Sequence, residues 1–559
     1  DPSRRATSRS LPGGPTRMAR SKPSSTRSTK RSDTTSSNLT AGCRPTNDAI
    51  AGATFCSAML WEQVSRTVPR ACALATPGGC VAKMRGGDDC VIHGGTYRRA
   101  CPSGTNWSTA AYDFSGKNGT ASDYTVVKGY PGEIATLCVG TDACQANPGC
   151  STVGVFSSTS YVKFENLHVQ GALRIGTSGT LWGTHHVSIT GNDLSGGAIC
   201  DGNFAMLRIE ESQAVQVDHN LIHNISAGNC TGNGHWSGIK LYGGQDTVIE
   251  YNTIERGTGD LMTHVIDNKD CPMGTTIRYN RFKDGVYRHA AQCYHCRSGV
   301  NPENLSIYGN VWSLDPSLSY GVLHLINNTC SGCSTILTGF DIHHNPFDNI
   351  GPSWNPGSEP APAAIRNYRF VDNAFRAGGG NDCGGGDCNH FVSGSVWGDR
   401  TGWELDYNRY DSASNYVSCG YGGSSCTAQT HTALTGWQGA TGKEGHSGEA
   451  SPGCSFVDTT SYKIPTGTAC KTASSTGGEV GAYGATDCVG HTCGQGTCGN
   501  GIVETGEQCD GGNLGGQTCV TLGYSSGTLS CTSACAFDTS GCTITPPPTV
   551  EGLERDDTR

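Results

Sequence analysis

Ile249-Glu-Tyr-Asn252-Thr-Ile254 is one copy of a six-residue pattern that recurs along the middle of this chain: apolar, any, any, asparagine, any, apolar. Seven further complete copies have their asparagine at positions 192, 220, 280, 310, 345, 373 and 408, and Phe164-Glu-Asn166-Leu-His-Val169 is an imperfect ninth. Successive asparagines from Asn192 onward are 28 to 35 residues apart. Such a period is typical of a solenoid, in which every repeat adds one layer to a shared core.

The apolar residues on either side of each asparagine indicate how the chain bends. The residue three before the asparagine and the residue two after it are apolar in all eight complete copies. Because side chains alternate between the faces of a strand, both belong to one core if the asparagine lies at a bend. Asparagine tolerates a left-handed backbone, and its amide can bond to amides stacked above and below. A leucine-rich repeat, the competing solenoid, is shorter and contains helix. The pattern predicts an all-β fold, a right-handed parallel β-helix.

The composition favours a turn-rich protein of an oxidising compartment. The chain has 559 residues, of which 80 are glycine and 30 are cysteine, and only 16% are charged. So many cysteines indicate a secreted protein. The sequence contains no run of 18 apolar residues, so no transmembrane helix is predicted. The net charge is −9; residues 1–38 hold nine Lys/Arg and two acids, so the remainder is acidic. An acidic body argues against a nucleic-acid partner.

The chain divides into four predicted segments. Residues 1–40 form a basic Ser/Thr/Arg-rich segment that we expect to be disordered, the alternative being an arm that binds polyanions. Residues 41–487 form the β-helix, with coils over roughly 80–485 and a cap that includes a short helix at 49–66. Residues 488–542 form a cysteine-rich module and residues 543–559 a proline-containing tail. We expect a monomer.

Three stretches outside the repeat carry a family likeness. They are Gly86-Gly-Asp-Asp-Cys-Val-Ile-His-Gly-Gly-Thr-Tyr97, Gly119-Thr-Ala-Ser-Asp-Tyr-Thr-Val-Val-Lys-Gly-Tyr-Pro-Gly-Glu133 and Gly478-Glu-Val-Gly-Ala-Tyr-Gly484. They resemble the first strand and turn, the next segment and the last coil of secreted parallel β-helix proteins of the polysaccharide-lyase type. The resemblance implies the fold over residues 80–485 and leaves the reaction open.

The C-terminal cysteines form a separate pattern. Cys498-Gly-Asn-Gly-Ile-Val-Glu-Thr-Gly-Glu-Gln-Cys509-Asp-Gly-Gly-Asn513 is followed by cysteines at 519, 531, 535 and 542. This stretch resembles the cysteine-rich repeat of secreted proteins of myxobacteria and their relatives, which implies a bacterial, extracellular or cell-surface protein. A module this small needs disulfides, and six cysteines allow three.

Two CxxC motifs lie in the β-helix. Cys293-Tyr-His-Cys296 and Cys330-Ser-Gly-Cys333 fall on successive coils, which could bring them together. In a cytosolic protein this arrangement would indicate zinc. We predict disulfides instead because the compartment is oxidising, and zinc remains the alternative.

A column of basic side chains is predicted on the outside of the β-helix. Leu207-Arg208-Ile209 and Ile239-Lys240-Leu241 both place the cation 12 residues before a repeat asparagine. The flanking apolar residues point inward, so the cations point outward, about 4.8 Å apart on adjacent coils. Such a column favours an anionic partner, an acidic polysaccharide, and the alternative is a row of solvated charges paired to Glu210 and Glu211. The expected substrate-binding members are Arg174, Arg208, His264 and His324, with Lys240.

A second cluster is His264-Val-Ile-Asp267-Asn-Lys269-Asp270, with Arg288 about one coil later. It resembles the lysine-then-arginine arrangement of β-helix lyases that act on uronic-acid polymers. The resemblance implies that Lys269 removes a proton at C5 while Arg288 neutralises charge or protonates the leaving oxygen. Lys240 is a third candidate catalytic residue. The acidic side chains of Asp260, Asp267 and Asp270 are candidate Ca²⁺ ligands, and the alternative is a charged turn.

The sequence therefore supports two function classes. The first is a carbohydrate-active enzyme, a lyase that cleaves an acidic, uronate-containing polysaccharide by β-elimination. The second is a non-catalytic surface or matrix protein that binds glycans or acts as a rigid spacer. A hydrolase ranks below the lyase because the paired acids Asp88-Asp89 lie outside the coils, and no nucleophile motif indicates a Ser-His-Asp esterase.

Overall fold

The computed structural model describes most of the predicted coil region and part of the C-terminal module. The described residues are 76–100, 110–139, 152–179, 181–196, 204–225, 236–257, 262, 264–269, 273–285, 303–314, 336–348, 364–376, 388–393, 399–410, 415–420, 429–431, 433–449, 469–482, 509, 511–514, 517–519, 526–532 and 537–543.

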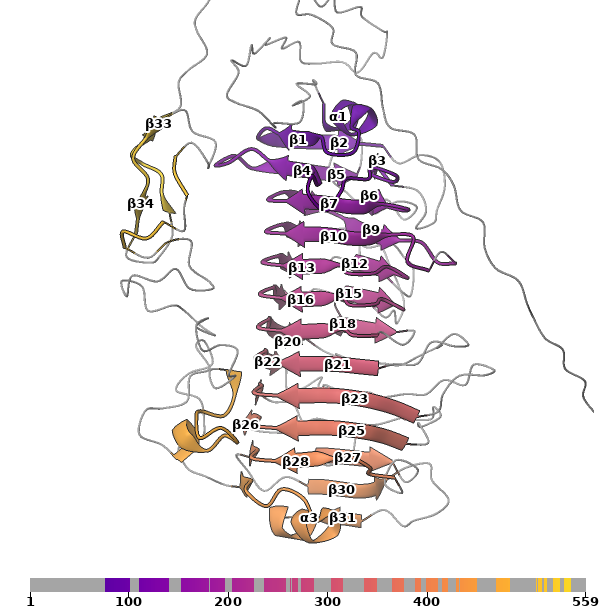
Figure 1. Ribbon diagram of the computed structural model, residues 1–559, viewed down its shortest axis with the longest axis vertical. Helices are drawn as coiled ribbons and strands as arrows, with labels where there is room; N and C mark the ends of the chain where they lie inside the picture. Colours follow the sequence, from indigo (N-terminus) through magenta and orange to yellow (C-terminus); the bar gives the residue numbers. More distant parts are fainter. Residues whose placement is uncertain are drawn as a thin grey trace, which may run out of the picture. The chain divides into compact units, whose positions relative to one another are not determined.

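Three parallel sheets form the faces of this region; each of the first six coils contributes one strand to every sheet, and the later described coils add strands to the first two (Figure 1). The first sheet, sheet A, contains β1 (Asp89–Ile92), β4 (Thr125–Gly129), β7 (Ser160–Glu165), β10 (His185–Thr190), β13 (Gln216–Asp218), β16 (Val248–Glu250), β19 (Thr276–Arg278), β21 (Glu303–Tyr308), β23 (Ile336–His343), β25 (Ala364–Val371) and β28 (Glu404–Asp406).

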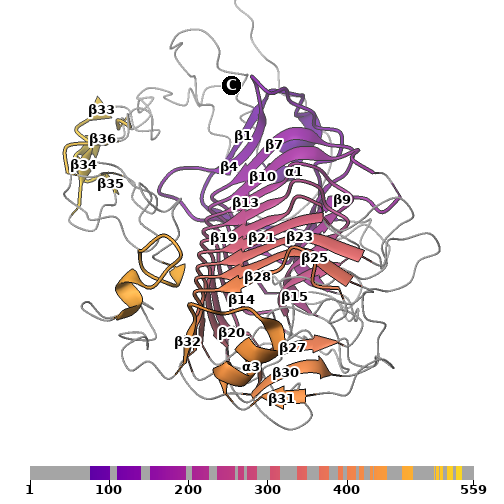
Figure 2. The same cartoon turned by 60° about the horizontal axis from the view of Figure 1, so that its bottom comes forward.

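Sheet B follows sheet A across the asparagine bend of each coil, and Figure 2 shows its strands beside those of sheet A. Its strands are β2 (Gly95–Arg99), β5 (Ala135–Val139), β8 (His168–Gln170), β11 (Asp193–Ser195), β14 (Leu221–His223), β17 (Thr253–Glu255), β20 (Arg281–Gly285), β22 (Val311–Leu314), β24 (Pro346–Asp348), β26 (Ala374–Arg376), β29 (Arg409–Tyr410) and β32 (Gly448–Glu449).

Sheet C closes the earlier coils on their third side. It contains β3 (Tyr112–Asp113), β6 (Thr152–Phe156), β9 (Ala172–Gly176), β12 (Ala205–Glu210), β15 (Ser237–Tyr242) and β18 (His264–Lys269). The later coils carry a smaller sheet of β27 (Cys388–Ser393), β30 (Asn415–Gly420) and β31 (Gln429–His431). This architecture confirms the predicted all-β parallel β-helix.

The core consists of the apolar residues that the repeat predicts. Ile249 and Ile254, which flank Asn252, are both fully buried, as are the equivalent Ile277 and Phe282 of the next coil. Later coils replace aliphatic residues with rings: the Phe375 ring stacks on Phe347 and on Tyr410, with centroids 4.8 and 4.9 Å apart. Each coil therefore buries its apolar side chains only because its neighbours cover them.

The repeat asparagines form a continuous hydrogen-bonded ladder. Each amide nitrogen donates to the amide oxygen of the next coil's asparagine; Asn252 donates to Asn280 over 2.9 Å, for example. The same amide oxygen also accepts the backbone N–H of the preceding ladder asparagine. The ladder is continuous from Asn192 to Asn408. At its end Asn408 donates to the buried carboxylate of Glu444 over 3.1 Å.

The predicted bend differs from the structure in two respects: which residue is left-handed, and which residue of the imperfect copy joins the ladder. The left-handed residue is the one before each asparagine, such as His219 (φ 56°) or Tyr251 (φ 54°), and not the asparagine itself. The asparagine is instead held by the ladder, which uses both its side chain and its backbone N–H. In the imperfect copy, Leu167 occupies the ladder position, because its backbone N–H donates to the Asn192 amide oxygen. Asn166 is the left-handed residue there.

Helix α1 (Pro77–Lys83) covers the first coil, and the disulfide Cys80–Cys90 ties it to β1. Helix α3 (Leu434–Thr441) follows β31, with Trp437 fully buried. The predicted helix at 49–66 lies outside the described residues. The described part of 478–484 contains no strand, contrary to the predicted last coil. Segment 469–482, which begins with the 3₁₀ turn η2 (Ala469–Thr472), instead packs on the coils: Ser475 donates from its backbone and hydroxyl to the Asp372 carboxylate.

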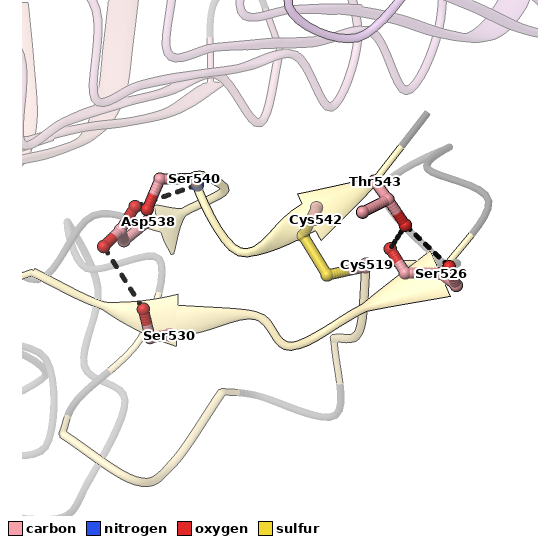
Figure 3. Close-up of a disulfide and its surroundings, with 7 residues drawn as sticks. All are labelled: Cys519, Ser526, Ser530, Asp538, Ser540, Cys542 and Thr543. Atoms are coloured by element: carbon pink, nitrogen blue, oxygen red, sulfur yellow. Dashed lines mark hydrogen bonds between the residues drawn. A yellow bond between two sulfur atoms is a disulfide. The ribbon is translucent and has the colours of Figure 1, made fainter. Parts of the chain in front are cut away.

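The C-terminal module contains short hairpin strands and disulfides, in accord with the prediction. Strand β33 (Ser526–Gly527) pairs with β36 (Cys542–Thr543), and β34 (Ser530–Cys531) pairs with β35 (Phe537–Asp538). Disulfides join Cys509 to Cys531 and Cys519 to Cys542. Figure 3 shows the second disulfide with the Ser526–Thr543 hydroxyl pair at 2.6 Å and the Ser530 hydroxyl donating to Asp538. The predicted CxxC cysteines at 293, 296, 330 and 333 lie outside the described residues.

Candidate functional site

Two rows of side-chain positions cross sheet C perpendicular to its strands. In the first row, strand register pairs Arg174 with Arg208, Arg208 with Lys240, and Lys240 with Asp267. The predicted stacking of the three cations on successive coils is therefore confirmed. The fourth coil carries an acid at this position, so the row is not uniformly basic.

The second row lies two residues further along the same strands. It runs through Gly176, Glu210, Tyr242 and Lys269, which the strand register makes partners on successive coils. Gly176 has a positive φ of 80°, and a Cβ atom there would meet the Glu210 carbonyl oxygen, so this corner favours glycine. Only two coils carry opposite charges in the two rows, with Arg208 and Glu210 on β12 and Asp267 and Lys269 on β18.

The charges of the first row are paired with carboxylates. Arg174 donates to Glu210 from Nε over 3.1 Å and from Nη2, and Arg208 donates to the other oxygen of the same carboxylate. Lys240 Nζ lies 3.2 Å from an Asp267 carboxylate oxygen. Glu210 also accepts the backbone N–H of Ser178 over 3.1 Å. These contacts form two groups: Arg174, Glu210 and Arg208 across β9 and β12, and Lys240 with Asp267 across β15 and β18.

Burial is the main departure from the predicted exposed column. Lys240 and Asp267 are 0% exposed, Glu210 is 1% exposed and Arg174 is 7% exposed. Only Arg208, whose side chain is 15% exposed, reaches the surface among the three cations. Arg174 and Arg208 pair with Glu210 as the alternative interpretation expected, but these side chains are largely buried and not solvated. Since a buried charge needs a partner, the cations of the first row depend on their ion pairs, two of which are with Glu210 of the second row.

His264 was predicted to belong to the basic column, and the structure contradicts this. Its register partner in β15 is Ser237, and Asp267 occupies the column position instead. His264 shares the strand parity of Ile266 and is 2% exposed, so it belongs to the inner face of the sheet. A turn one residue longer between β18 and its ladder asparagine, compared with the previous coil, shifts the alignment.

The calcium prediction rests on Asp260, Asp267 and Asp270. Only Asp267 is described, and a Ca²⁺ ion there would compete with the Lys240 ammonium for its carboxylate. Within the part of the chain that the structure describes, no group of three metal-ligating side chains comes together. Asp267 therefore fits an ion pair better than a calcium shell of several oxygens, and calcium binding stays a prediction that chelation with EDTA would test.

The remaining predicted residues are placed only in part. The backbone of Lys269 closes β18, two residues after Asp267 and in register with Tyr242. Arg288, His324, Asp260 and Asp270 lie outside the described residues.

Tyr242 is a residue of this surface that sequence reasoning missed. Its ring lies beneath the Arg208 guanidinium, whose carbon is 4.4 Å from the ring centroid, and the side chain is partly exposed. The signal was present in the sequence: Tyr242 follows Lys240 by two residues, the spacing of one face of a strand.

No helix among the described residues is long and apolar enough to cross a membrane. A family described as "Right handed beta helix region" matches residues 153–347, and no curated protein matches the chain.

Solved structures with a similar course of the chain include several carbohydrate enzymes. An alginate lyase from Paenibacillus sp. str. FPU-7 is 15% identical, with 55% of this chain and 93% of that chain covered and a TM-score of 0.33. A mannuronic acid specific polysaccharide family 6 lyase from human gut microbiota is 13% identical, with 59% and 76% covered and a TM-score of 0.32. A GH87 alpha-1,3-glucanase is 12% identical, with 61% and 60% covered and a TM-score of 0.27. The family match and the sheet topology together make this chain a parallel β-helix protein.

Proposed function

We propose that this chain is a secreted, carbohydrate-active protein that cleaves an acidic, uronate-containing polysaccharide by β-elimination. The observation that carries the proposal is the row of charged side chains on sheet C, which lies in register on β9, β12, β15 and β18, the strand that carries Lys269, and forms two ion-paired groups. Other ion pairs on the described coils are more exposed, such as Lys283–Glu255, whose side chains are 35% exposed.

The Lys240–Asp267 pair holds the strand that carries position 269. Asp267 is two residues before Lys269 and is paired with Lys240. The Asp267 charge is therefore balanced by Lys240, and Lys269 is the proposed base. A catalytic group held on a regular strand is positioned more accurately than one on a loop.

The proposed reaction uses few groups. The Lys269 amine takes the proton from C5 of the uronate, the C4–O bond breaks, and a C4=C5 double bond forms in the product. A cation must neutralise the uronate carboxylate while negative charge develops, and Arg288 is the proposed residue for this role. Arg208, the cation of the first row that reaches the surface, is proposed to bind a neighbouring uronate.

The test is the appearance of an unsaturated, ultraviolet-absorbing product from a panel of uronate polymers. We expect one polymer to give product and Lys269→Ala to lower kcat by roughly 100-fold or more, since a general base contributes at least that factor. Lys283→Ala, which removes a lysine from sheet B, is the matched control and should keep full activity. If the parent protein gives no product with any polymer, the lyase proposal is wrong.

The second candidate function is a non-catalytic glycan-binding or spacer protein. The burial of Lys240 and Arg174 favours it, because ion pairs inside a sheet stiffen a solenoid without contacting a ligand. Under this alternative, acidic polymers give no product, and any binding they show is unchanged by Lys269→Ala.

A further inference from the structure

We infer that Tyr242 is the group that gives a proton to the leaving sugar oxygen; this rests on the proposed lyase function. Strand register makes Tyr242, on β15, the partner of Lys269 on the following coil. Adjacent coils of a parallel sheet are about 4.8 Å apart. A base and an acid one coil apart can therefore act on the two carbons of one sugar unit, C5 and C4.

The surroundings of Tyr242 suit a proton donor. The Arg208 guanidinium lies 4.4 Å from the ring centroid, and its positive charge stabilises the phenolate that remains after the proton has left. Arg208 is itself held by Glu210, which is almost fully buried and anchored by Arg174 and by the Ser178 backbone. The cation is therefore fixed over the ring by side chains that are themselves buried and hydrogen-bonded.

Accessibility separates Tyr242 from its neighbours. Lys240 and Glu210 on the same face are buried, whereas Tyr242 is partly exposed. Among the described residues of the two rows, Tyr242 and Arg208 are the side chains that a polymer lying across sheet C can reach. A tyrosine hydroxyl can give up its proton, whereas an arginine guanidinium in a protein does not, so Tyr242 is the better donor of the two.

The step balances with the proposed reaction. The Lys269 amine gains the C5 proton and becomes an ammonium, the C4–O electron pair leaves with the oxygen, and that oxygen takes the Tyr242 phenolic proton. The ammonium then returns a proton to the phenolate through water, and the site is restored. No oxidant, reductant or second substrate is needed.

The experiment compares Tyr242→Phe with Tyr251→Phe, a control whose tyrosine lies on the asparagine bend and stacks on Tyr279. On the polymer identified in the panel, we expect Tyr242→Phe to lower kcat by roughly 100-fold or more with little change in KM, and Tyr251→Phe to act as the parent. On a synthetic uronate whose C4 leaving group is a nitrophenolate, which needs no proton, the loss should shrink to a few-fold.

A structural role for the ring is tested by Tyr242→Leu, with thermal unfolding of each variant as a check on folding. Phenylalanine keeps the contact with Arg208 and leucine removes it. If Tyr242→Phe keeps activity and only Tyr242→Leu loses it, or if the loss is equal for both leaving groups, the inference is wrong. A parent protein that cleaves the polymer then leaves the lyase proposal standing.

Discussion

The Lys240–Asp267 ion pair provides the sharpest test of the structure, because a buried pair and an exposed column predict different losses of stability when Lys240 is replaced. Lys240→Met removes the ammonium and leaves the Asp267 carboxylate buried. At 3.2 Å and an effective dielectric constant of about 20, the attraction between the two charges is about 5 kcal/mol. Breaking a buried pair typically costs about 3–5 kcal/mol. We expect a loss of that size in the free energy of unfolding, whereas a solvated lysine would cost almost nothing.

Lys283 is a matched control, since its Nζ also lies 3.2 Å from a carboxylate oxygen, that of Glu255. Both of those side chains are 35% exposed, in contrast to 0% for Lys240 and Asp267. Lys283→Met should therefore cost less than about 1 kcal/mol. Denaturant unfolding followed by circular dichroism measures both. The double variant Lys240→Met with Asp267→Asn should recover most of the loss. Equal losses for Lys240→Met and Lys283→Met would refute the reasoning.

Two further predictions concern the coils. Asn280→Ala should lower the free energy of unfolding by about 2–4 kcal/mol, because it leaves buried ladder partners in both neighbouring coils unpaired. The comparison in the same denaturant assay is Asn304→Gly, which removes an exposed asparagine at a φ of 58° where glycine is tolerated, and equal effects would contradict the ladder. Burial raises the pKa of Asp372 despite the hydrogen bonds from Ser475. The native state then binds the proton more tightly than the unfolded state, so this group's contribution to stability is present at low pH and falls as pH rises through the native pKa. The stability of the parent relative to Asp372→Asn should increase as pH is lowered from neutral, and a difference that does not vary with pH would contradict it.

The fold could be predicted because the same pattern occurs in eight complete copies along the chain. Each coil repeats the same apolar–asparagine spacing, and the ladder bonds fix the register independently of the turns. The alignment of Arg208 with Lys240 followed, because both lie 12 residues before their ladder asparagine. In the next coil the residue in register, Asp267, lies 13 residues before Asn280. The 12-residue spacing therefore does not identify it, and His264 was wrongly assigned to the column.

The character of the candidate site could not be predicted in the same way. Alternation within a strand says that a side chain leaves the core, but not whether other parts of the protein cover it. Lys240 leaves the core and is nevertheless 0% exposed. Its partner Asp267 lies 27 residues later, and only the register of the following coil brings the two together. Tyr242 was overlooked because an aromatic residue at a strand end also fits ordinary packing.

The asparagine ladder has a direction as well as a pattern. From Asn192 to Asn408 every side-chain amide points its N–H toward the following coil, so the amide dipoles are aligned head to tail and their positive ends face the C-terminal side. Aligned dipoles polarise one another and leave partial charges at the two ends of the row. The side chain that meets the positive end is Glu444, a carboxylate that accepts from Asn408 and from the Tyr410 hydroxyl. A carboxylate has no N–H to pass on, so Glu444 both neutralises the end of this side-chain macrodipole and prevents another amide from extending it.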